Sequence, residues 1–100
     1  MYIIIGEQRA SILKDTHTVL SLEKIVHEGM EDRAYCIVPR EVVNLLEVPQ
    51  LKQHVDLHEQ FVIEYEKNNY EYCRDAVQHL YGKFGGELNS FYDEILKRIS

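Results

Sequence analysis

Residues 62–75 read VIEYEKNNYEYCRD, and the structure of this stretch decides how the second half of the chain folds. The asparagine pair Asn68-Asn69 separates two clusters of tyrosine and glutamate. The stretch is compatible with three structures: a β-hairpin that turns at the asparagines, two helices joined there, or one continuous helix. Each of the three gives residues 50–81 a different shape.

The hairpin is the least favoured of the three structures. It would place Glu66 opposite Glu71, and like charges that face each other across a strand pair are destabilising. It would also place Tyr65 opposite Tyr72, which is favourable. However, two-residue hairpin turns prefer glycine after asparagine, and here the second residue is another asparagine. We therefore expect a helical structure.

The hydrophobic period favours one helix across the asparagines. Side chains that recur every three or four residues line one face of a helix, and this rhythm runs without a break past the asparagine pair. The residues on this face are Leu51, Val55, His58, Val62, Tyr65, Asn69, Tyr72 and Ala76. The second interpretation is a joint between two helices, because Asn68 followed by Glu71 has the pattern of a capping box.

The choice between one helix and two bears on assembly. A continuous helix over residues 50–81 would be about 48 Å long, whereas a compact chain of this length has a radius of gyration of about 13 Å. Part of the 51–80 stripe would then need a second chain, with His58 and Asn69 as polar positions in the seam. A joint would let the halves pack on each other in a monomer. Both a homodimer through residues 51–80 and a monomer stay open.

The first third of the chain has the signals of a small sheet. Met1 to Ile5 predicts a strand, Gly6-Glu7 a turn, and the alternation in Gln8 to Leu13 a partner strand. Residues 20–28 predict a short helix, with Ser21 as its N-cap. Ala34 to Val38 is an apolar run, which predicts a buried strand that ends at Pro39.

Helical signals dominate after Pro39. Val42, Val43, Leu45 and Leu46 form the apolar face of a predicted short helix between Pro39 and Pro49. Residues 87–99 predict a final helix with one apolar stripe and basic residues in its last turn. We therefore expect a single α+β domain over residues 1–100. It has a β-rich part (1–38) of two or three strands with a short helix, and a helical part (39–100) of two or three helices.

Charge and hydropathy restrict the partners. The chain has 17 acidic and 11 basic residues, and the net charge of −6 disfavours binding to nucleic acid or to an anionic membrane. The same field attracts a basic protein. Met1 to Ile5 is the longest apolar run, far shorter than the roughly 20 residues that cross a bilayer. We expect a cytoplasmic protein without a membrane span.

Residue types that carry chemistry are present, but their patterns are weak. His54 and His58 have the i, i+4 spacing of helical zinc ligands, yet the zinc-protease pattern requires glutamate where Val55 stands. Cys36 and Cys73 are expected to be buried thiols, and neither sequence context indicates a reactive thiolate. We therefore predict no catalytic residue, no cofactor and no metal. His54 and His58 are the weak candidates for metal ligands.

Seven tyrosines and no tryptophan form the one unusual feature of the composition. Tyrosine is enriched at protein interfaces, and several tyrosines gather with acids around the asparagine pair. The predicted partner-binding residues are Tyr65, Glu66, Asn69, Tyr70, Tyr72 and Asp75. The leading hypothesis is a non-catalytic binding or regulatory module, of the inhibitor, antitoxin or immunity type, that pairs with itself or with a basic protein. The alternative is a small metal-binding protein or metal-dependent enzyme that uses His54 and His58.

Overall fold

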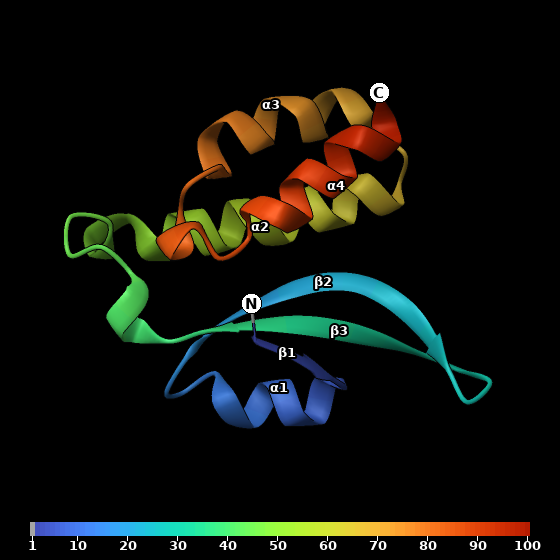
Figure 1. Cartoon of the computed structure of the whole chain (residues 1–100), viewed down its shortest axis with the longest axis horizontal. Helices are drawn as coiled ribbons and strands as arrows, with labels where there is room; N and C mark the ends of the chain where they lie inside the picture. The colour runs from blue at the N-terminus through green and yellow to red at the C-terminus, as the bar shows by residue number, and fades with distance from the viewer. Residues whose placement is uncertain (1) are drawn as a thin grey trace.

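A three-stranded antiparallel sheet lies between a short helix on one face and three helices on the other (Figure 1). The computed structural model describes residues 2–100, without the side chain of His27. The strands are β1 (Tyr2–Ile5), β2 (Thr18–His27) and β3 (Met30–Val38), in the spatial order β1-β3-β2. The helices are α1 (Glu7–Leu13), α2 (Leu51–Glu66), α3 (Tyr70–Leu80) and α4 (Asn89–Ile99). This arrangement confirms the predicted α+β class.

The segment after β1 is a helix, and the predicted second strand over residues 8–13 is wrong. Gly6 has a φ of 108°, which turns the chain away from the sheet. Ala10 and Leu13, three residues apart on one side of α1, then pack on the sheet face formed with Tyr35 and Ile37. The position beside β1 belongs to β3, whose longer apolar run offers more pairing than residues 8–13. Met1, the first residue of the predicted strand, lies outside the described residues.

The helix predicted over residues 20–28 is also wrong, because this segment is strand β2. It pairs antiparallel with β3, with Leu20 opposite Cys36 and a β-bulge between Ser21 and Lys24. Leu20 and Leu22 are buried against the helices. Ser21 caps no helix, and its main chain contacts α2 instead. The predicted strand over residues 34–38 is confirmed as the buried end of β3.

Residues 39–49 form no α-helix, so the short helix predicted there is wrong. Single 3₁₀ turns at Arg40–Val42 and Val48–Gln50 flank a loop in which Leu45 and Leu46 are 85% and 88% exposed. The Asn44 side chain accepts a hydrogen bond from the Leu46 amide at 2.8 Å. This local bond competes with a helical backbone, which explains the failure of the helical prediction.

The stretch that contains the asparagine pair is a joint between two helices. Helix α2 ends at Glu66 and α3 begins at Tyr70, so the continuous helix is wrong and the joint is correct. The cap is Asn69, whose side chain accepts from the Tyr72 amide, and not Asn68 as predicted. Asn68 has a φ of 65°, a left-handed conformation that asparagine tolerates better than most residues.

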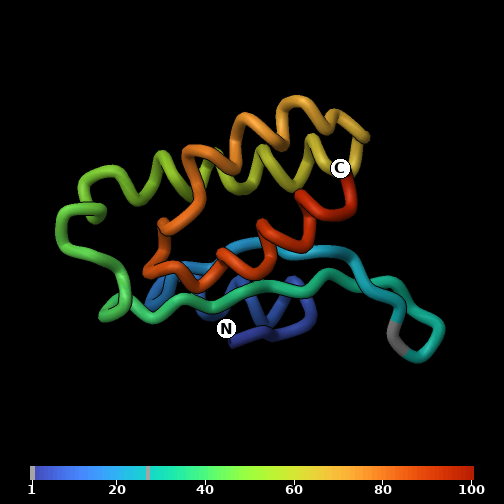
Figure 2. The backbone as a smooth tube through the Cα atoms, turned by 45° about the horizontal axis from the view of Figure 1, so that its top comes forward, coloured from blue at the N-terminus to red at the C-terminus, as the bar shows by residue number. Residues whose placement is uncertain are grey.

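The joint folds α3 back along α2, and the two helices lie side by side (Figure 2). The apolar stripe of residues 51–80 therefore enters the core of its own chain, where Phe61 and Val62 of α2 meet Ala76 and Val77 of α3. The longest dimension of the molecule is 39 Å, shorter than the continuous helix would have been. Helix length is thus no reason to expect a dimer through this stripe.

The final helix is confirmed, beginning at Asn89 rather than residue 87. Tyr92 and Ile95 are its buried residues, and Lys97 and Arg98 lie in its last turn. Within residues 2–100, none of the helices has the length and apolar character that crossing a bilayer requires.

The two asparagines of the joint should respond differently to substitution. Asn69→Ala removes the side-chain cap of α3 and is expected to lower the free energy of unfolding by about 1 kcal/mol. Asn68→Gly places at a positive φ the residue that adopts it without strain, and should leave stability unchanged or slightly higher. Urea unfolding of both variants beside the parent chain measures the difference. Equal losses for the two variants would contradict the assignment of Asn69 as the cap.

Candidate functional site

His58 is a fully buried residue of α2 that contacts the sheet on one side and helix α4 on the other. Its Nε2 lies 2.7 Å from the carbonyl oxygen of Ser21 on β2, and its Nδ1 lies 2.8 Å from the hydroxyl of Tyr92 on α4. A carbonyl can only accept, so Nε2 carries the proton and the Tyr92 hydroxyl donates to Nδ1. Burial lowers the pKa of His58 to about 4. The imidazole is therefore neutral at physiological pH, and its two hydrogen bonds link α2 to β2 and to α4.

The two histidines considered as metal ligands are not arranged as a metal site. Both nitrogens of His58 are used in the hydrogen bonds to Ser21 and Tyr92. The Nδ1 of His54 lies 3.6 Å from Glu47 Oε1, and Glu47 also accepts the Phe84 amide at 2.8 Å. Among residues 2–100, no three histidine, cysteine or acidic side chains are grouped as metal ligands would be.

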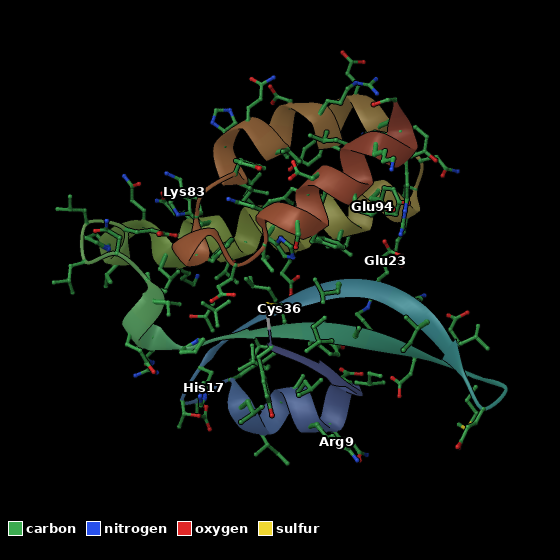
Figure 3. All side chains as sticks on the ribbon, viewed as in Figure 1. Arg9, His17, Glu23, Cys36, Lys83 and Glu94 are labelled. Atoms are coloured by element: carbon green, nitrogen blue, oxygen red, sulfur yellow. The ribbon has the colours of Figure 1, made fainter. Side chains whose placement is uncertain are left out.

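The two cysteines are buried thiols. Cys36 of β3 points into the core between the sheet and the helices (Figure 3), and Cys73 lies between α2 and α3. Burial, with a smaller contribution from the Glu87 carboxylate, raises the pKa of Cys36 to about 12. Burial also raises the pKa of Cys73. Both thiols are thus protonated at neutral pH, which does not favour nucleophilic chemistry.

The predicted strip of tyrosines and acids is divided between two hollows. Tyr65 and Glu66 line a hollow between β2, α2 and α4, with a volume of about 170 Å³. Asn69, Tyr72 and Asp75 line a second, more open hollow along α3. The six residues therefore do not form one surface.

Tyr70 lines neither of these two hollows. Its ring centroid is 6.1 Å from that of Tyr65, and its hydroxyl donates to Asn68 Oδ1 at 2.9 Å. Tyr70 of α3 therefore packs with Tyr65 of α2 across the joint between the two helices.

The hollow that contains Tyr65 and Glu66 continues into a larger one of about 370 Å³ between the sheet and α4. The two hollows share Leu22, Glu23 and Phe91, and we call them together the sheet–helix groove. The other residues that line the larger hollow are Ile3, Ile25, Ala34, Ser90, Glu94 and Arg98. Figure 3 shows Glu23 on β2 and Glu94 on α4, the elements on either side of the groove. Its floor is apolar and its rim is charged.

Ion pairs connect the charged rim across the groove. Arg98 of α4 pairs with Glu23 of β2 and, at 3.3 Å, with Glu94 of its own helix. A hydrogen bond with Tyr65, together with the Glu23 carboxylate, raises the pKa of Arg98 above its ordinary value. These contacts join α4 to the sheet and offset one of the two negative charges that Glu23 and Glu94 bring to the rim.

A second pair closes the other end of the groove. Arg33 of β3 donates to both carboxylate oxygens of Glu66, at 2.9 and 3.1 Å, and to the carbonyl of Leu22 at 2.8 Å. Leu22 lies in the β-bulge of β2, so Arg33 connects this bulge to Glu66 on α2.

The outer side of β1 is an uncovered sheet edge. The Gly6 amide donates to the Arg33 carbonyl at 3.0 Å, so Gly6 faces β3. Backbone groups alternate along an antiparallel strand, and the N–H and C=O groups of Ile3 and Ile5 therefore point away from β3. Within residues 2–100 the sheet contains no strand beyond β1 on this side. The side chains of Ile3 and Ile5 are 51% and 37% exposed.

At Ser21 the opposite edge of the sheet is covered by helix α2. Glu59 accepts the Ser21 amide at 3.2 Å and the Ser21 hydroxyl at 2.9 Å, while His58 binds the Ser21 carbonyl. A bulge also interrupts β2 at this point. Proteins protect exposed sheet edges by such covers and bulges, or by lysine and proline on the strand. Strand β1, with the sequence YIII, has none of these.

Sequence reasoning missed this edge because residues 8–13 were expected to pair with β1. A signal was available in the run of β-branched residues without charge or proline at residues 3–5.

The chain matches no protein-family model, no curated protein and no solved structure. Its function is therefore inferred from its own residues.

The buried His58 predicts a pH dependence of stability. Its pKa is about 4 in the folded chain and about 6.5 when unfolded, so the unfolded chain binds the proton more tightly. Stability from this residue is complete above pH 6.5 and is lost as the pH falls towards 4, by about 3 kcal/mol in total. Urea unfolding from pH 7 to 4 measures the loss. His58→Gln, which keeps a donor and an acceptor but does not titrate, should show a smaller decline, and an equal decline would contradict the assignment.

Proposed function

We propose that this chain is a non-catalytic protein-binding module that receives an extended protein segment at the free edge of β1. In strand addition, main-chain hydrogen bonds supply affinity and pockets for alternate side chains supply specificity. The observation that carries the proposal is the contrast between the two sheet edges. Helix α2 covers Ser21 on β2, whereas Ile3 and Ile5 on β1 present unpaired backbone groups and exposed side chains.

The sheet–helix groove supports the same role. Ile3 lines the groove, so a strand added beside β1 would place every second side chain on the face where the groove opens. Those positions would be selected for apolar residues, because Leu22, Ala34 and Phe91 form the apolar surface there. The other side chains would lie on the opposite face, beside α1.

A binding role is preferred over the metal-dependent alternative for chemical reasons. His58 has both ring nitrogens engaged in hydrogen bonds, and the thiols of Cys36 and Cys73 are buried and protonated.

The net charge of −6 would steer a basic partner towards the chain. A regulatory protein of the inhibitor, antitoxin or immunity type that acts in the cytoplasm, through self-association or a basic protein, remains our proposal.

A peptide selection tests whether the β1 edge binds extended segments. Displayed random peptides selected on the immobilised chain should share alternate apolar residues. The best peptide, measured by calorimetry, should bind Ile3→Lys at least ~10-fold more weakly, because the variant puts a charge beside the free edge at a cost of about 1.4 kcal/mol or more. Val26→Lys is the matched control. Val26 is a β-branched strand residue that is 76% exposed, and it lies on β2, the other edge strand.

Two outcomes would overturn the proposal. One is that the selected peptides lack an alternating apolar pattern. The other is that their binding is reduced equally by Ile3→Lys and by Val26→Lys. Circular dichroism of both variants shows that each is folded before binding is compared.

A further inference from the structure

We infer that the segment received at the β1 edge is β1 of a second copy of this chain, paired antiparallel about a two-fold axis at Ile4. The inference rests on the proposed function and names its partner. The two three-stranded sheets would become one sheet of six strands. Such an interface is isologous, because the same surface serves on both sides.

The backbone pattern of β1 selects one register. Ile3 and Ile5 are the residues whose N–H and C=O groups face the free edge. When Ile3 lies opposite Ile5 of the second copy, the two-fold axis also sets Ile5 opposite Ile3 of the second copy. The edge-facing N–H and C=O groups of Ile3 and Ile5 are then hydrogen-bonded in both chains. Ile4 then faces Ile4 of the second copy across the axis, as a non-hydrogen-bonded pair. Among the residues that the structure describes, a register shifted by two residues in either direction leaves part of this set without a partner, since the shift towards α1 sets Ile3 opposite the helical Glu7.

The side chains of β1 fit the same arrangement. Residues 2–5 contain no charge, so no like charges are opposed across the axis although each copy carries −6. Ile3 and Ile5 lie on the face of the sheet that carries α2 and α4. The pairing would bring these two residues of both copies into one apolar cluster. Cross-strand pairs of β-branched residues of this kind stabilise sheets. Ile4 lies on the other face, half-buried beside α1.

The charges of the groove favour a second copy over a basic segment. The carboxylates of Glu23 and Glu94 are paired with Arg98, and that of Glu66 with Arg33. Lys24 is paired with Glu31 at 3.6 Å. Two arginines thus face the three carboxylates Glu23, Glu66 and Glu94, so the groove offers a basic peptide only one net negative charge, whereas the uncharged edge of β1 is complementary to itself.

The size of the contact sets the strength of the dimer. Stable interfaces bury about 800 Å² on each partner. A pairing through the four residues of β1, three of them isoleucines, buries less than this. The dimer should therefore be weak and depend on protein concentration in the micromolar range or above. Because both copies repel each other through their net charge, added salt should strengthen the dimer.

Analytical ultracentrifugation over a concentration series tests the association. The parent chain and Val26→Lys should shift from monomer to dimer as the concentration rises, while Ile3→Lys should stay monomeric throughout. Oxidative cross-linking of Ile4→Cys then tests the register. The non-hydrogen-bonded pair would bring the two Cα atoms to about 4.5 Å, within the range of a disulfide.

Ile12→Cys is the control for the cross-linking experiment. Ile12 lies on α1 and is 76% exposed, so its thiol is accessible but away from the proposed axis. The native Cys36 and Cys73 are fully buried and do not compete. A covalent dimer should form at least ~10-fold faster with Ile4→Cys than with Ile12→Cys, because only the first pair has disulfide geometry.

The outcomes separate this inference from the proposed function. A parent chain that is monomeric at all concentrations, or a dimer that persists in Ile3→Lys, overturns the second-copy pairing. Equal cross-linking of Ile4→Cys and Ile12→Cys overturns the register about Ile4. If the chain is monomeric but Ile3→Lys still abolishes binding of selected peptides, the second-copy inference fails and the proposed function stands.

Discussion

The imidazole of His58 lies between the Ser21 carbonyl and the Tyr92 hydroxyl, and these two hydrogen bonds connect β2, α2 and α4. A buried polar side chain without partners is costly, so the ring requires both neighbours to be in place. The neutral tautomer satisfies both, one by donating and one by accepting. This contact fixes helix α2 against strand β2 at one edge of the sheet, and the arrangement of the helical layer on the sheet depends on it.

Fixing α2 at β2 leaves the two sheet edges unequal. Glu59, adjacent to His58, completes the cover of Ser21, while β1 on the other side keeps the backbone groups of Ile3 and Ile5 free. The groove between the sheet and α4 opens next to this edge, and its rim is closed by Arg98 and its partners. A rigid scaffold thus presents one open edge with an apolar floor beside it, which is the geometry that strand addition uses.

Sequence patterns predicted the elements whose apolar faces recur with a regular period. The final helix, the start of α2 near residue 50 and the strand over residues 34–38 were found in this way. The capping asparagine was placed one residue early, since Asn68 and Asn69 both have the residue type of a cap. The proposed binding edge was missed, because α1 was read as a strand that would have covered it.

The sequence by itself determined the α+β class, the acidic charge and the long amphipathic helices, because these depend on composition and on contacts between residues three or four positions apart. Only the tertiary structure decided that residues 7–13 are a helix and residues 18–27 a strand. Short segments with mixed patterns follow whichever distant partner satisfies their backbone, and here β3 took the place beside both β1 and β2. The role of His58 was likewise decided by distance in space, since Ser21 and Tyr92 lie 37 and 34 residues away along the chain.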